Sequence, residues 1–159
     1  MPFAEKITFS RIRRITISYL AAVFVTYVAA SIFQSLCVLV ALQRAGAKMA
    51  MEDWLYTLWH DLYGFTFLGY APYGPAIMAG FIIAMPTAAI MHRFLRLPRG
   101  ILYPLAGAVA IASILYIVKL NFYGVTIFPG TRGWYGFGLQ LLAGAFGGAV
   151  FAGLSKQRP

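Results

Sequence analysis

The densest group of side chains that could do chemistry is Glu52, Asp53, His60 and Asp61. On a helix Asp53 and His60 share a face, because seven positions correspond to about two turns. A carboxylate beside an imidazole could act as a general base or bind a metal ion. A metal site needs three or four ligands, however, and Glu52 would point elsewhere. We therefore expect a solvated helix face here, and we predict neither a metal site nor a catalytic residue.

The loop before the last apolar segment is the second candidate. Two glycines, at 130 and 133, bracket Thr131 and Arg132. Glycine lets a backbone approach a ligand closely, and arginine offers a planar fork for phosphate or carboxylate. A plainer interpretation is a tight turn with Arg132 among lipid headgroups. The predicted residues for binding a ligand or lipid headgroup are Arg132, Thr131, Trp134, His60, Asp53 and Trp59.

Other kinds of catalytic site find little support. Cys37 is the single cysteine, which excludes an internal redox pair, and it lies in an apolar stretch where packing is its expected role. His92 falls on the opposite side of the membrane from His60, so the two could not ligate one haem or metal. No cofactor is predicted, and a bound lipid or quinone is the ligand that the alternative function below would require.

The amino-acid composition indicates whether these residues belong to a soluble protein or to a membrane protein. Hydrophobic residues make up 61% of the 159 residues and charged residues only 11%, with a mean hydropathy of +0.76. Soluble domains average about 25% charged residues. The chain has too few charges to coat a soluble globule, so we expect an integral membrane protein.

Four apolar segments are long enough to cross the hydrocarbon core, which takes about 20 helical residues. They lie at 15–43, 70–91, 101–118 and 134–154. The predicted fold class is therefore an all-α integral membrane protein with four transmembrane helices. No linker or repeat divides the chain, so a single domain over 1–159 is expected.

The segment between the first two spans predicts a further helix at about 49–63. Its apolar residues Met51, Leu55, Leu58 and Leu62 recur every three or four positions, which is the period of one helix face. Tryptophan and tyrosine fill its flanks. Amphipathic helices rich in these aromatics favour the headgroup layer, so we expect an interfacial helix on the outer face.

The basic residues predict the orientation. Nine of them lie in the N-terminal segment, the connection between the second and third spans, and the C-terminal tail; four lie on the other side. Cytoplasmic loops carry the excess of lysine and arginine, so both termini should be cytoplasmic in a bacterial inner membrane. The charge of +9 is explained by this topology and by attraction to membrane lipids, without a nucleic-acid partner.

Small residues recur at helical spacing in the second, third and fourth spans, where the third has Ala106 and Ala110. Such rows let helix backbones approach closely where lipid offers no hydrophobic drive for association. Packing within the bundle is the simpler interpretation, and a face for another integral membrane subunit is the alternative. The predicted packing residues are Ala76, Gly80, Ala84, Ala88, Gly144 and Gly148.

The sequence leaves three hypotheses for the function of the protein. The leading hypothesis is a non-enzymatic accessory subunit of a larger inner-membrane complex, packing through its small-residue faces. The alternative is a small lipid- or quinone-binding protein, carrier or enzyme, with a site on the outer leaflet near Arg132. A homo-oligomeric pore is the weakest, because the small-residue face of the second span offers no polar lining.

Overall fold

The computed structural model describes residues 2–48, 50–67, 73–95, 97–121, 123, 128–131 and 133–156, with side chains from residue 10 onward except those of 65–67. Over this part the chain is helical and contains no strand. The helices are α1 (Pro2–Arg44), α2 (Met51–Phe67), α3 (Tyr73–Leu95), α4 (Arg99–Asn121) and α5 (Trp134–Leu154), with the 3-10 turn η1 (Pro129–Thr131) before α5.

Four of these helices are long and apolar enough to cross a membrane. They are Ser10–Arg44 within α1, together with α3, α4 and α5. The prediction of an all-α membrane protein with four spans is confirmed. Helix α5 coincides with its predicted span, whereas α1 and α4 run beyond theirs at both ends and α3 runs beyond its span at the C-terminal end. Backbone hydrogen bonds continue past the last apolar residue, so that α4, for example, begins at Arg99 and ends at Asn121. Residues 70–72 of the predicted second span lie outside the described residues.

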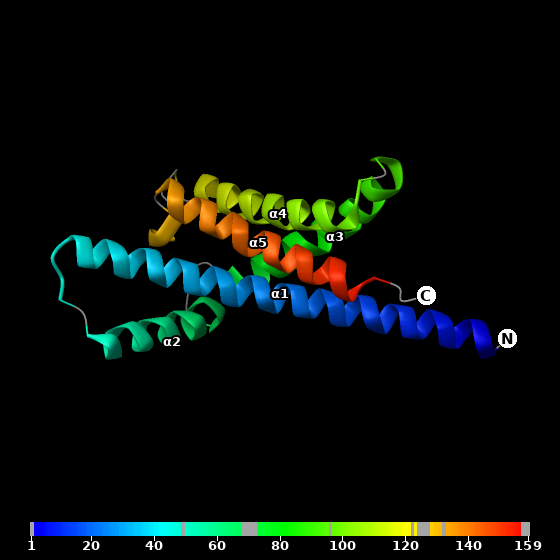
Figure 1. Cartoon of the computed structure of the whole chain (residues 1–159), viewed down its shortest axis with the longest axis horizontal. Coiled ribbons are helices and arrows are strands. Elements are labelled where there is room, and N and C mark those ends of the chain that lie inside the picture. Colours follow the sequence, from blue (N-terminus) through cyan, green and yellow to red (C-terminus); the bar gives the residue numbers. More distant parts are fainter. Residues whose placement is uncertain are drawn as a thin grey trace.

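Helix α1 is the longest element and lies along the rest of the bundle. Its 43 residues correspond to about 65 Å, roughly twice the thickness of a hydrocarbon core. In Figure 1 it extends past the ends of α4 and α5 in both directions. A helix of this length must tilt in a bilayer or project from it.

Helices α1, α4 and α5 pack most extensively, with α5 between the other two. Glycines bring α4 and α5 together: a Cβ atom on Gly107 would overlap the carbonyl oxygen of Gly144, and one on Gly148 would overlap that of Tyr103. On the other flank of α5, a Cβ atom on Gly147 would overlap the hydroxyl of Thr26 in α1. The core of the bundle therefore depends on direct contact between backbones.

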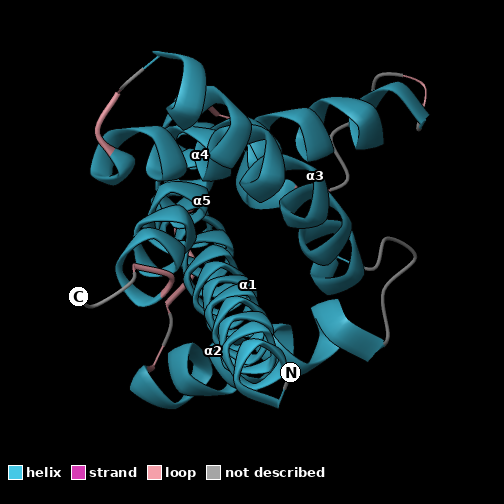
Figure 2. Ribbon diagram, turned by 90° about the vertical axis from the view of Figure 1, so that its right-hand side faces the viewer, coloured by secondary structure: helices cyan, strands magenta, loops and turns pink. Residues whose placement is uncertain are grey.

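Helix α2 is attached to the side of α1 that faces away from α4 and α5 (Figures 1 and 2). The Ser35 hydroxyl of α1 donates to Asp61 Oδ2 at 2.7 Å, and the Tyr27 hydroxyl donates to the carbonyl oxygen of Leu62. The predicted helix at 49–63 thus exists, but begins at Met51 and continues to Phe67. Its location in the headgroup layer stays a prediction.

Candidate functional site

The structure gives Asp53 and His60 separate surroundings. Asp53 Oδ2 accepts the backbone N–H of Ala50 at 2.9 Å, just before α2 begins, which is a capping contact that satisfies a free donor at the helix start. His60 is exposed, stacks on Tyr56 with ring centroids 5.9 Å apart, and has Nδ1 3.9 Å from Asp61 Oδ1. The two residues share a helix face without forming a joint site.

The remaining residues of the predicted outer site are divided between two flanks of α1. Trp59 is exposed on α2, which contacts α1 and α3, whereas η1 contacts α1 and α5. Thr131 is buried, and its hydroxyl donates to the carbonyl oxygen of Phe128 at 2.8 Å. Trp134 is 89% exposed at the start of α5. Arg132 lies outside the described residues.

Thr131 and Trp134 line a small cavity of about 300 Å³ between α4 and α5, at the end of the bundle where α5 begins. Lys119 supplies its only charge among the lining residues described. His60, Asp53 and Trp59 are absent from that lining. The described part of the predicted outer site is therefore two separate surfaces, one on α2 and one beside α5.

The two rows of predicted packing residues have different surroundings. Gly144 and Gly148 in α5 lie directly against the backbone of α4. The row in α3 instead lines an open groove of about 660 Å³ between α3 and α4. Its members, all lining that groove, are Ala76, Gly80, Ala84 and Ala88.

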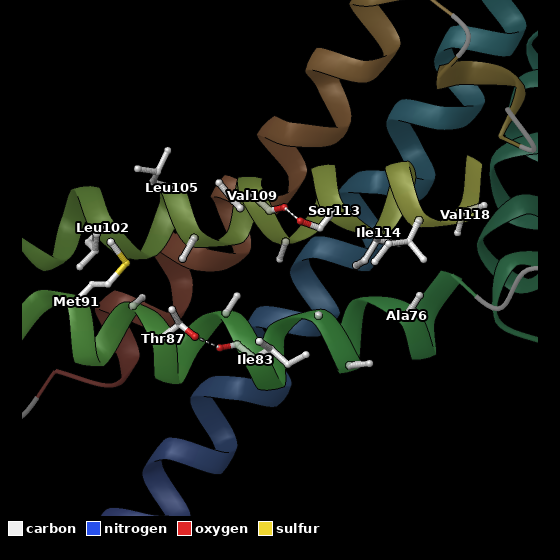
Figure 3. Close-up of a pocket in the computed structure, with 17 residues that line it drawn as sticks. Ala76, Ile83, Thr87, Met91, Leu102, Leu105, Val109, Ser113, Ile114 and Val118 are labelled. Atoms are coloured by element: carbon white, nitrogen blue, oxygen red, sulfur yellow. Dashed lines mark hydrogen bonds between the residues drawn. The ribbon is translucent and has the colours of Figure 1, made fainter. Parts of the chain in front are cut away.

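The groove has a buried floor and exposed edges (Figure 3). On the floor Ala88 is 1% exposed and Ala110 is buried. On the edges Ile83 is 71% exposed, and Leu105 and Val109 are more than half exposed. The small side chains leave room between the helices, while the larger ones stand along the sides.

Two hydroxyl groups in the groove are already satisfied. Thr87 donates to the carbonyl oxygen of Ile83 at 2.7 Å, and Ser113 donates to that of Val109 at 2.9 Å, both within their own helix (Figure 3). These bonds to the carbonyl four residues back leave the groove with an almost wholly apolar surface. A ligand in this groove would therefore be held by shape complementarity and van der Waals contact.

A buried polar network joins α1, α3 and α5. The Tyr73 hydroxyl donates to Gln140 Oε1 at 2.8 Å, and Gln140 Nε2 donates to the carbonyl oxygen of Ala30 at 3.0 Å. Neither this network nor the Ser35–Asp61 bond is predicted from the sequence. The signal was available, because Gln140 is a polar residue within an apolar span, where polar side chains need a partner. Its partners, though, come from helices distant in the sequence.

Comparisons of the chain with protein-family models, with curated proteins and with solved structures give no match. Its function must therefore be argued from its own geometry. The groove between α3 and α4 is left open by its own side chains, whereas the polar network is closed by its internal hydrogen bonds.

Proposed function

We propose that this protein is a non-enzymatic accessory subunit of a larger inner-membrane complex. The groove between α3 and α4 would receive a transmembrane helix of a partner subunit. The observation that supports this is the lining of the groove, with small residues on both walls and its two hydroxyls bonded within their own helices. A helix docked there would gain close packing without having to match any buried polar group.

A partner helix suits this lining better than a loose lipid chain. Small residues at intervals of four allow a second backbone to come close, and the apolar edges would then contact its side chains. In α3 the row includes Ala76, Gly80 and Ala84, and α4 contributes Ala106 and Ala110 on the facing wall. A fluid acyl chain gains no comparable advantage from small residues.

Photo-crosslinking in the native membrane would test the proposal. A photoreactive amino acid at Ala79, which is exposed and lines the groove, should crosslink to one protein in a one-to-one product. The matched control is Ala149, an exposed alanine on α5 that lies outside the groove lining. The Ala79→Leu variant should fill the groove, remain folded and lose the partner during gentle purification.

Two outcomes would contradict the proposal. One is equal crosslinking from Ala79 and Ala149, which would indicate random collision in the membrane. The other is purification of the chain, with an intact groove, as a protein without any stoichiometric partner.

The proposed location is a bacterial inner membrane with both termini in the cytoplasm. Support comes from the charges at the end of the bundle where α3 ends and α4 begins. There Arg93 lies in the last turn of α3 and Arg99 is the first residue of α4. Arg11, Arg13 and Arg14 lie in the N-terminal part of α1. We call this the basic end, and the positive-inside rule assigns it to the cytoplasm.

A second candidate function is the binding of a lipid or quinone at the opposite end. The cavity beside Thr131 and Trp134 favours it, since about 300 Å³ is at the lower limit for a small-molecule pocket. Native mass spectrometry would separate the two candidates. A lone chain carrying one defined lipid or quinone, released by Lys119→Gln, would favour this second function over the first.

A further inference from the structure

A different cavity, of about 670 Å³, lies at the basic end between α1, α3, α4 and α5. Residues near the ends of the helices give it a basic rim, which consists of Arg11, Arg14, His92 and Arg99. One or more turns deeper along the same helices, its lining is apolar and includes Phe81, Met85 and Phe151. The cavity is thus positively charged at its rim and apolar in its deeper part.

Arg99 is held in place at this rim. Its Nη2 donates to Ser155 Oγ at 2.8 Å, and its guanidinium carbon lies 5.1 Å from the centroid of the Tyr103 ring. Arg99 is also the first residue of α4, where the helix dipole adds to the positive potential. A half-buried guanidinium in a fixed position differs from the freely moving arginines found among lipid headgroups.

The rim also contains donors that the described part of the chain does not satisfy. The Nε atoms of Arg14 and Arg99 are both buried without a hydrogen-bond partner. Leaving a buried donor unpaired costs about 1–3 kcal/mol, and more when the group is charged. Both arginines line the cavity, so an acceptor bound there would lie beside their guanidinium groups.

No carboxylate among the described side chains is available to neutralise this rim. The acidic residues whose side chains the structure describes are Glu52, Asp53 and Asp61, and all three lie on α2. Helix α2 follows the far end of α1, away from the basic end (Figure 1). Within the described side chains, the arginines of the rim therefore have no carboxylate beside them.

We propose that this cavity binds the phosphate group of an anionic membrane lipid. Arg14 and Arg99 would contact the phosphate, because the guanidinium fork matches its oxygens. The lipid chain would lie along the deeper apolar lining, which includes Phe81 and Phe151. Basic pockets between transmembrane helices are known to hold anionic headgroups in this way. The inference does not depend on the groove between α3 and α4 or on its occupant.

Lipid titration of the purified, full-length protein in neutral detergent would test this inference. Native mass spectrometry should show phosphatidylglycerol retained at least about tenfold more tightly than phosphatidylcholine. Arg14→Gln and Arg99→Gln should each weaken phosphatidylglycerol binding by about tenfold, because a hydrogen bond to a charged group contributes about 1.5–3 kcal/mol and tenfold corresponds to about 1.4 kcal/mol.

The matched controls are Arg13→Gln and Arg93→Gln. Both arginines are exposed near the same end and lie outside the cavity lining, so the charge change is identical while the site stays intact. Their lipid affinity should remain within about twofold of the wild type. Equal losses for Arg13→Gln and Arg14→Gln would overturn the proposal, since they would indicate a diffuse surface charge.

Two further measurements separate binding from folding and lipid from free phosphate. Arg99→Lys keeps the charge but loses the fork, and it should weaken phosphatidylglycerol binding with an unchanged melting temperature in lipid-free detergent. Unchanged binding in this variant would overturn the role given to Arg99. Glycerol 3-phosphate should not displace the lipid; displacement at comparable concentrations would overturn the assignment to a lipid.

Discussion

The two faces of α4 show how the same kind of residue can produce opposite results. Toward α5, Gly107 meets Gly144 so closely that neither position has room for a Cβ atom. Toward α3, Gly80 meets the side chain of Ile114, and a Cβ atom there would lie 2.9 Å from Ile114 Cδ1. One face is a closed seam between backbones, and the other leaves the groove described above.

The difference lies in what α4 presents to each neighbour. Gly107 has no side chain, and near it the backbone at Tyr103 and Pro104 is exposed to α5. On the other side the side chain of Ile114 stands between the backbone of α4 and Gly80 of α3. A row of small residues therefore shows only that close approach is allowed, and the facing helix decides whether it occurs.

The largest expected effect comes from a substitution that forces the backbones of α4 and α5 apart. Gly148→Ala would place a Cβ atom against the carbonyl oxygen of Tyr103 and within 2.8 Å of Pro104 Cα, and backbone atoms cannot rotate away. We expect a loss of about 3 kcal/mol in the free energy of unfolding. Unfolding by increasing mole fractions of dodecyl sulfate, followed by circular dichroism, would measure it.

Gly153→Ala is the matched control for that variant. Gly153 is on the same helix and has open space at its Cβ position, so its unfolding free energy should stay within about 1 kcal/mol of the wild type. Similar losses in the two variants would mean that glycine is needed along all of α5, and that the seam is not special.

An intermediate effect is expected where α5 meets α1 and α3. Gln140→Leu would remove the bond to Ala30 and leave the Tyr73 hydroxyl without its acceptor. The expected loss is about 1–2 kcal/mol. The double variant with Tyr73→Phe should lose less than the sum of the single variants, because no stranded hydroxyl remains. Strictly additive losses would show that the network is not coupled.

The smallest effect is expected on the open side of α4. In Gly80→Ala the new Cβ atom meets the flexible end of Ile114, which can change its rotamer. The unfolding free energy should change by less than about 1 kcal/mol. A loss as large as that of Gly148→Ala would remove the distinction between the seam and the groove.

Much of the fold could be predicted from the sequence, because bilayer thickness sets the length of an apolar helix. The predicted span at 134–154 coincides with α5, and the predicted span at 101–118 is contained in α4. Helix ends were less predictable. Residues such as Arg99 and Asn121 continue a helix through backbone hydrogen bonds, which hydropathy does not register.

The candidate sites were less predictable, and for a different reason. Asp53 and His60 were considered together because spacing along one helix can be read from the sequence. The lining of the cavity at the basic end includes Arg14, Arg99 and Ser155, whose positions are separated by most of the chain. Only packing of four helices brings them to one cavity, so no local pattern could have indicated it.

The sequence by itself determined that this is a membrane protein, that it has four spans and that its fold is all-α. These properties follow from how many apolar residues occur in succession. The tertiary structure alone decided which small residues meet a neighbour and which stay open. It also decided that Asp61 bonds to Ser35 of α1 while His60 remains exposed. Helix periodicity defines a face, but its partner depends on the rotation and tilt of every other helix in the bundle.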